Sequence, residues 1–227
     1  MEEYRTEFSG KLILSLGQKI FFMCLLVFIF GLGFCAKASA ATWYVATDGS
    51  DSTGNGAIGT PWKTLYKALN CTGACTVQPG DTVQLRAGTY NEPDGGNARS
   101  YIYYNPTTPG AAITIQPYPS ESVTINIASD ITGAYMFKSA NAVVWTGESF
   151  TNLLNFTNTN SKTANFALLT GSAANTYNNC SIDGNNVAAN QVGLNLSSYT
   201  GTLTVTRSVI SRFVGGSYGM ILQQNER

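Results

Sequence analysis

The sequence predicts an all-β solenoid, in which short parallel strands stack as a β-helix behind one short N-terminal capping helix. Three observations lead to this fold class. Residues 79–92 form an alternating strand between turn residues. The second half repeats with a period of roughly 30 residues, the length of a solenoid coil. Asn, Thr, Ser and Gly surround short apolar runs, as is typical of all-β proteins.

Residues 79–92 supply the first predicted coil. A Gly-Asp turn leads into a strand in which Val83 and Leu85 point to one side and the polar residues between them point to the other. Gly88 then ends the strand. A strand this short cannot bury its apolar side alone, so stacking on further coils must shelter it.

The repeat predicts which side chains stack on one another. Four segments align, at residues 134–139, 166–171, 193–198 and 219–224. They predict two neighbouring interior columns, which are Tyr135, Ala167, Leu194, Met220 and Phe137, Leu169, Leu196, Leu222. A second set of segments predicts an interior column on another wall, made of Phe150, Ile182 and Ile210. The outward positions of the first wall would then be polar, namely Lys138, Thr170, Ser197 and Gln223.

Residues 60–69 have the residue types that are typical of the start of a helix. Thr60 can act as the N-cap, and Pro61 occupies the first helical position. Trp62, Leu65 and Leu69 fall on one face and two lysines on another. An amphipathic helix placed ahead of the first coil would cover the open apolar end of a solenoid.

Residues 1–40 are predicted to be an export signal. Basic residues precede the apolar run 20–30, and Ala38-Ser39-Ala40 fits a cleavage site, so the mature chain would begin at Ala41. The alternative is an uncleaved membrane anchor, because the apolar run is near the lower length limit for a span. We expect a protein that is secreted or held at the cell surface.

The predicted organisation has three parts. Residues 1–40 are the signal peptide or anchor, residues 41–78 are the N-terminal strand, loop and capping helix, and residues 79–227 are parallel β-helix coils. No capping element follows the last coil, and open solenoid ends are normally covered. We therefore expect the solenoid to be incomplete, as the N-terminal part of a longer protein or a truncated product.

Export would allow the cysteines to form a disulfide, because extracellular compartments are oxidising. Cys71 and Cys75 are close enough to form a small disulfide loop, the alternative being two free thiols. Cys180 is left over and is expected to face the core as a small apolar side chain.

Charge and composition limit the possible partners and chemistry. The chain of 227 residues has 13 basic and 13 acidic residues and no His. A balanced charge gives no reason to expect nucleic acid as a partner, and a membrane only through the N-terminal apolar run. Without His, acid–base chemistry would depend on carboxylates, Lys, Arg or Tyr. We expect a monomer.

Several short motifs resemble the pectate-lyase-like right-handed parallel β-helix superfamily, including its bacterial secreted members. They are Trp43-Tyr44-Val45, Pro61-Trp62-Lys63-Thr64, Pro79-Gly80-Asp81-Thr82-Val83, Gly88-Thr89-Tyr90 and Ile113-Thr114-Ile115-Gln116-Pro117-Tyr118. The resemblance extends over residues 42–227. It implies a right-handed solenoid and a polysaccharide partner, whereas the same fold carries lyases, glycosidases and non-catalytic surface proteins.

The resemblance implies a carbohydrate-active protein, the N-terminal part of a polysaccharide lyase or glycosidase acting on acidic polysaccharide. Lyases of this superfamily use calcium, which offsets the uronate charge, and a Lys or Arg base that removes the neighbouring proton. Calcium is therefore the expected cofactor if the chain is a lyase, with catalytic residues beyond residue 227. The alternative is a non-catalytic, adhesin-like surface protein that binds glycans or other partners.

Some residues are candidates for binding, and no catalytic residue is carried over from the family. Tyr101, Tyr103 and Tyr104 could stack on sugar rings, or could pack a loop against the outer wall. Three cations could bind an acidic sugar, namely Lys138, Arg207 and Arg212. Asp183 is the candidate metal ligand, although solvated turn positions are the alternative for it and for the arginines. Asp48 and Asp51 fit turn chemistry better than a calcium loop.

Overall fold

A computed structural model describes residues 17–18, 21, 39–92, 102–107, 110–127, 134–139, 142–149, 152–158, 164–169, 173–185, 192–196, 199–214 and 218–221. The chain divides into two compact units, Met1–Ser39 and Ala40–Arg227. In the first unit, residues 17, 18 and 21 are helical. Within the described ranges, no helix has both the length and the apolar character that a membrane crossing requires.

The first sheet of the second unit has six parallel strands, each of which is four or five residues long. In spatial order these are β1 (Thr42–Val45), β3 (Thr82–Leu85), β6 (Ile113–Pro117), β9 (Val143–Thr146), β12 (Asn175–Asn178) and β15 (Leu203–Thr206). Apolar residues alternate along the strands, so Val83, Ile115, Trp145 and Tyr177 follow one another in register on the buried side.

The second sheet has five strands, which are again parallel. They are β4 (Gly88–Glu92), β7 (Val123–Ile127), β10 (Leu154–Asn158), β13 (Cys180–Asp183) and β16 (Val209–Ser211). Its inward column is Tyr90, Ile125, Phe156, Ile182 and Ile210.

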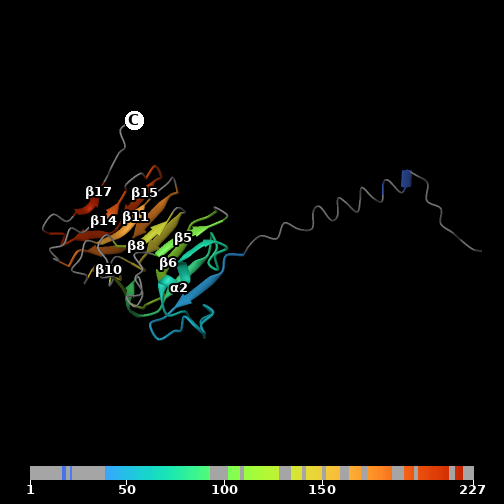
Figure 1. Cartoon of the computed structure of the whole chain (residues 1–227), viewed down its shortest axis with the longest axis horizontal. Coiled ribbons are helices and arrows are strands. Elements are labelled where there is room, and N and C mark those ends of the chain that lie inside the picture. The colour runs from blue at the N-terminus through green and yellow to red at the C-terminus, as the bar shows by residue number, and fades with distance from the viewer. Residues whose placement is uncertain are drawn as a thin grey trace, which may run out of the picture. The chain divides into compact units, whose positions relative to one another are not determined.

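The third sheet has six parallel strands, several of which appear in sequence across Figure 1. They are β2 (Cys71–Gly73), β5 (Ile102–Pro106), β8 (Ala134–Ser139), β11 (Ala164–Leu169), β14 (Val192–Asn195) and β17 (Tyr218–Ile221). From β3 onward the chain visits the three sheets in rotation, so each strand pairs with the strand three further along. The prediction of an all-β protein with parallel strands is confirmed.

One apolar core joins the three sheets. The Trp145 ring of the first sheet makes edge-to-face contacts with Phe137 of the third sheet at 5.1 Å and with Phe156 of the second sheet at 5.3 Å. Phe156 also meets Tyr177 at 6.4 Å. Edge-to-face pairs of this kind contribute about 0.5–1.5 kcal/mol beyond their area burial. The described core residues form a single cluster.

In the third sheet, the predicted alignment of Ala167 with Leu194 and Met220 is confirmed, but the predicted register between β8 and β11 is wrong by two residues. Ala167 lies opposite Phe137, not Tyr135, while Tyr135 lies opposite Asn165. The interior column is therefore Ile102, Phe137, Ala167, Leu194 and Met220. A shift of two keeps each side chain on its original face, so alternation alone cannot detect it.

The same shift changes the predicted outward column. Lys138 is followed in register by Leu168, Asn195 and Ile221, not by Thr170, Ser197 and Gln223. These last three residues and Leu222 lie outside the described residues. Leu196 is buried, as the sequence predicted.

The second sheet also differs from its predicted alignment. Phe156, not Phe150, lies opposite Ile182, and Phe150 itself lies outside the described residues. The reason is a turn that precedes β10, in which Glu148 N donates to Asn152 O (3.1 Å) and Asn152 N donates to Ser149 O (3.2 Å). The predicted alignment instead placed a strand around Phe150.

The helix is shorter than predicted and has a different cap. Helix α2 spans Leu65–Leu69, and its N-cap is Thr64, whose hydroxyl accepts from Lys67 N at 3.0 Å. Thr60 and Pro61 do not begin it, because Trp62 pairs with β1 through Trp62 N to Tyr44 O (3.1 Å) and Ala46 N to Trp62 O (2.8 Å). Trp62, Leu65 and Leu69 are nevertheless buried together, as predicted.

Two carboxylates bind the N-terminal backbone of this short helix. Asp51 Oδ1 accepts from Lys63 N (2.8 Å) and Thr64 N (3.1 Å), and Glu92 Oε1 accepts from Leu65 N (2.6 Å). Glu92 is only 1% exposed. Helix α2 lies toward the end of the unit opposite β15 and β17 (Figure 1), and its Leu65 and Leu69 are buried there. Asp51 has a turn and capping role, which is the alternative that the sequence favoured over calcium.

Candidate binding groove

The candidate site lies where the chain turns from the first sheet into the second. Thr146, Asn178 and Thr206 occupy the last outward positions of β9, β12 and β15, in register. Gln116 of β6 directly follows Ile115, the register partner of Trp145, and so extends the same row. Their inward neighbours pack in the core, so alternation turns these polar side chains toward solvent. The parallel pairing then aligns them as a row of amides and hydroxyls along one edge of the sheet.

A groove of about 360 Å³ runs beside this row, and we call it the corner groove. Its lining combines the ends of the strands with the turn residues that follow them, namely Gln116, Pro117, Pro119, Thr146, Gly147, Glu148, Asn178, Asn179 and Arg207. The lining has one carboxylate and one guanidinium, and the remaining polar groups are amides, a hydroxyl and backbone.

Hydrogen bonds order the polar row. Thr206 Oγ1 donates to Asn178 Oδ1 (3.1 Å), and Asn178 Nδ2 donates to Thr146 Oγ1 (3.2 Å). Arg207 Nε and Nη2 both lie 3.4 Å from Asn178 Oδ1. The guanidinium is therefore held against the row by weak, long bonds and keeps donors for a further partner.

The turns that form the groove use left-handed backbone conformations. Asn179 has φ 50° and Arg207 has φ 47°, which lets the chain turn sharply between β12 and β13 and between β15 and β16. Asn tolerates this region better than other non-Gly residues do. Asn179 is 3% exposed, and its Nδ2 donates to Gly147 O at 3.3 Å. Its Oδ1 is the one buried side-chain polar atom without a partner among the described residues.

The two charged residues of the groove are not neutralised by each other. Among the described residues, neither Arg207 nor Glu148 forms an ion pair. Glu148 Oε2 accepts from Ser120 N (3.0 Å) and Asn152 Nδ2 (2.8 Å), which fixes the carboxylate in place. The groove thus offers a positive and a negative group to one ligand.

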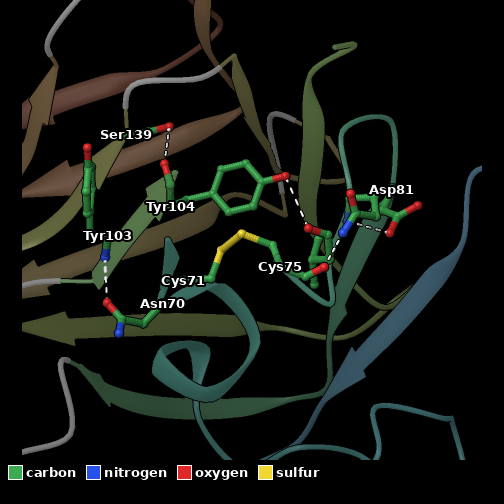
Figure 2. Close-up of a disulfide and its surroundings, with 9 residues drawn as sticks. Asn70, Cys71, Cys75, Asp81, Tyr103, Tyr104 and Ser139 are labelled. Atoms are coloured by element: carbon green, nitrogen blue, oxygen red, sulfur yellow. Dashed lines mark hydrogen bonds between the residues drawn. A yellow bond between two sulfur atoms is a disulfide. The ribbon is translucent and has the colours of Figure 1, made fainter. Parts of the chain in front are cut away.

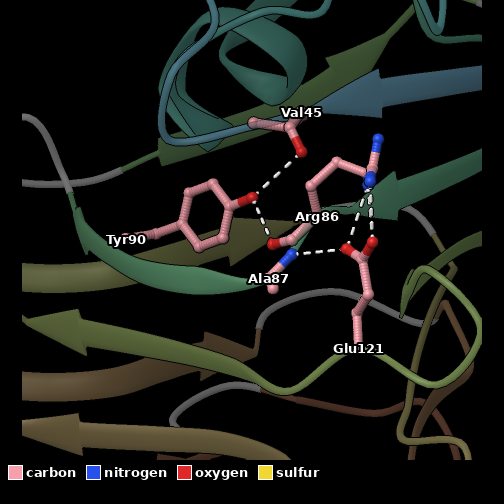
Figure 3. Close-up of polar contacts among 5 residues, drawn as sticks. All are labelled: Val45, Arg86, Ala87, Tyr90 and Glu121. Atoms are coloured by element: carbon pink, nitrogen blue, oxygen red, sulfur yellow. Dashed lines mark hydrogen bonds and ion pairs between the residues drawn. The ribbon is translucent and has the colours of Figure 1, made fainter.

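At the other end of the first sheet, the turn from β3 to β4 contains an ion-paired arginine. There Arg86 Nε lies 2.9 and 3.0 Å from the two oxygens of Glu121, and Ala87 N donates to Glu121 Oε2 at 2.6 Å (Figure 3). The hydrogen bond from Arg86 lowers the pKa of Glu121. The Arg86 guanidinium also lies 4.7 Å from the centre of the Tyr118 ring. The charge of Arg86 is thus paired with Glu121, whereas Arg207 forms no ion pair with any described residue.

Of the predicted sugar-stacking tyrosines, one lies beside a predicted cation. Tyr103 of β5 and Lys138 of β8 are register partners, and Lys138 Nζ lies 5.2 Å from the centre of the Tyr103 ring. Tyr103 N donates to Asn70 Oδ1 at 3.0 Å. These two residues lie on the third sheet, apart from the corner groove. Tyr101 lies outside the described residues.

Tyr104 cannot stack on a sugar, which corrects the prediction. Its side chain is fully buried, and its hydroxyl donates to Val77 O at 3.3 Å (Figure 2). Burial raises the pKa of Tyr104 above its ordinary value. Alternation along β5 places Tyr103 and Tyr104 on opposite faces, so only one of them can face solvent.

Asp183 and Arg212 bind each other instead of a metal and a substrate. Arg212 Nε donates to Asp183 Oδ1 at 2.7 Å, and Arg212 Nη2 bonds to Asp183 Oδ2. The hydrogen bond from Arg212 lowers the pKa of Asp183. Asp183 has Thr157 and Ser211 as register neighbours, so no second carboxylate joins it. Across the described residues, no three acidic, Cys or His side chains gather to hold a metal ion, and these residues do not fit a calcium site.

The structure contains a disulfide between Cys71 and Cys75, with an S–S distance of 2.03 Å (Figure 2). It lies at the start of β2, the first strand of the third sheet, next to helix α2. Cys180 is free and buried, and burial raises the pKa of its thiol to about 12. Cys180 is therefore an inert core residue at neutral pH.

Sequence reasoning found Arg207 but missed the residues around it. Gln116, Glu148, Asn178 and Asn179 share no motif, because they come from three separate segments that only the strand register brings together. A correct register would have aligned Gln116, Thr146 and Asn178 as one outward row.

Comparison with known proteins adds no relative. The sequence matches no protein-family model, and neither the curated proteins nor the solved structures give a match.

Proposed function

We propose that this chain is an exported, right-handed parallel β-helix that binds acidic polysaccharide in the corner groove. The β-helix part of the proposal is supported by the rotation of the chain through three parallel sheets and by the aromatic contacts that link all three. The short motifs that resemble the pectate-lyase-like superfamily point the same way. The export part depends on the signal-like N-terminal sequence.

The observation that carries the binding proposal is that Arg207, which forms no ion pair with any described residue, lies beside a row of amides and hydroxyls. A guanidinium presents paired donors that match a carboxylate, such as that of a uronate. The carboxylate of Glu148 and the amide oxygen of Gln116 are acceptors for sugar hydroxyl groups. One ligand class with both a carboxylate and many hydroxyls is an acidic polysaccharide. Its carboxylate would face Arg207, and its hydroxyls would face Glu148.

The row also suits an extended ligand. Gln116, Thr146, Asn178 and Thr206 lie on adjacent strands, which are spaced about 4.8 Å apart in any β-sheet. A polymer that runs across the strands meets a similar hydrogen-bonding group at each step. We therefore expect affinity to increase with the length of the oligosaccharide.

Binding can be measured by calorimetry on the exported full chain, with polygalacturonate as the probe and amylose as the neutral control. We expect binding of polygalacturonate that weakens with added salt, since charge attraction is screened. Arg207→Gln should weaken binding about tenfold or more, because charge-assisted hydrogen bonds are lost. Arg212→Gln is the matched control and should keep the affinity, since Arg212 is occupied by Asp183.

Equal losses in the two arginine variants, or no binding to polygalacturonate by the folded chain, would refute the groove proposal. Cleavage of the bound polymer is a separate question. The described groove has one carboxylate, Glu148, and supports binding; the family resemblance alone supports cleavage. Ultraviolet absorbance of unsaturated uronate products, with calcium added, tests for a lyase in the same samples.

A further inference from the structure

Asp81 makes an unusual contact with the first residue after the predicted cleavage site. Ala41 N donates to Asp81 Oδ1 at 2.8 Å. The other carboxylate oxygen, Oδ2, accepts from Trp43 Nε1 and from Gln78 N, each at 2.8 Å. Thr82 N also donates to Ala41 O at 2.9 Å, so the backbone of Ala41 is fixed on both sides.

Among the described residues, this buried carboxylate has no cation as a partner. Asp81 is 4% exposed, and among the described residues no Lys or Arg forms an ion pair with it. Buried carboxylates are costly unless they are paired with a positive charge. Three neutral N–H donors satisfy its hydrogen bonds and leave its charge uncompensated.

We propose that cleavage between Ala40 and Ala41 completes this site, because it turns the Ala41 amide into the α-ammonium that pairs with Asp81. Hydrolysis consumes one water and leaves a carboxylate on Ala40 and an ammonium on Ala41. The ammonium is positively charged below about pH 7.7 and has three donors where the amide has one. Ala40 is exposed and Ala41 is half-buried, so the new terminus would begin where the packed structure begins.

The site of processing would determine whether the buried charge of Asp81 is compensated. A mature chain that began even two residues earlier would have an amide at position 41 and its ammonium in solvent. Cleavage before Ala41 would therefore raise the stability of the folded protein.

The test uses the full chain, exported by a host that removes N-terminal signals. Intact mass should show loss of residues 1–40. A variant with Ala-Gly inserted between Ala40 and Ala41 keeps the cleavage motif but moves the ammonium away from Asp81. We expect its melting temperature to be lower than that of the wild type by about 3 °C or more, at pH 6. Asp81→Asn in both backgrounds should abolish that difference.

A second measurement does not depend on the folding of the Asp81→Asn variants. The α-amine of the wild type should react with an acylating reagent about tenfold more slowly than the α-amine of the insertion variant, since an ion-paired ammonium is protected. The proposal is overturned if the mature chain starts elsewhere. It is equally overturned if the two chains have the same melting temperature and the same labelling rate.

Discussion

The two ends of the β-unit are built differently. At the N-terminal end, helix α2 buries Leu65 and Leu69, and the carboxylates of Asp51 and Glu92 satisfy the start of the helix. At the C-terminal end, the last described strands expose Tyr218 by 57% and Met220 by 37%, although Met220 belongs to an interior column. Among the described residues, the same inward pattern is thus covered beside helix α2 and partly exposed at β17.

The difference shows what an alternating strand pattern can and cannot do. The pattern decides which side chains face inward, but burial depends on the next element in the stack. We expect stability to decrease from the N-terminal end toward the C-terminal end. The predictions below test that gradient, beginning with the largest expected effect.

Removing an apolar side chain should cost more at the covered end. Leu65→Ala should lower the free energy of unfolding by about 2–5 kcal/mol, because Leu65 is fully buried. Met220→Ala should cost about 1 kcal/mol, since only part of its surface leaves water. Urea unfolding followed by circular dichroism measures both. Equal costs would contradict the gradient.

Removing the disulfide should bring the two ends closer in stability. The double variant Cys71→Ser, Cys75→Ser opens a loop whose cysteines are four positions apart, and chain-entropy arguments give a cost of about 2 kcal/mol. Amide hydrogen exchange should show the loss in β2 and helix α2. Cys180→Ala is the control, since that thiol is free, and it should leave exchange in β2 unchanged.

Replacing a capping carboxylate should matter more than replacing a surface one. Glu92→Gln should cost about 1 kcal/mol, because charge-assisted bonds to Leu65 N and Tyr66 N become neutral ones. Asp183→Asn, near the other end, should cost about 0.5 kcal/mol, since its partner Arg212 is half-exposed and solvent weakens the ion pair. Thermal unfolding of the two variants gives the ranking, and the reverse order would count against it.

Acid should weaken both ends slightly. Arg86 lowers the pKa of Glu121 from 4.5, and Arg212 lowers the pKa of Asp183 from 3.8. A lowered folded-state pKa contributes stability that is present above the unfolded value and is lost as pH falls through the folded one. Stability should therefore decline as pH falls below about 4.5. Glu121→Gln should reduce this decline in urea unfolding at pH 3 to 6, and an unchanged decline would rule out the pair as its source.

Much of the fold could be predicted from the sequence, because alternation along short strands is a local signal. Val83 and Leu85 identify the inward face of β3 without any knowledge of its neighbours. Pairing between strands is not local. Placing Phe137 or Tyr135 opposite Ala167 keeps the same face inward, so the choice depends on turn lengths that the sequence does not reveal.

The site was harder to predict than the fold. From the sequence alone, Arg207 and Asp183 are both predicted to be solvated charged residues in turns. The structure separates them, because Asp183 has Arg212 as its partner and Arg207 has only the amide of Asn178 among the described residues. Whether a charge is already neutralised depends on residues about one circuit away. The predicted alignment of Ile182 with Ile210 is confirmed and makes Ser211 the register partner of Asp183, but alignment alone does not show that the Arg212 side chain binds Asp183.

The three tryptophans could serve as built-in optical reporters for two separate regions. Trp43 and Trp62 stack at 5.2 Å beside helix α2, whereas Trp145 lies among the aromatic rings that join the three sheets. Stacked indoles couple their electronic transitions, so the near-ultraviolet circular dichroism of the Trp43–Trp62 pair would respond to the loss of the N-terminal cover. The emission of Trp145 would respond to the opening of the middle of the protein. One unlabelled sample could thus report which region melts first.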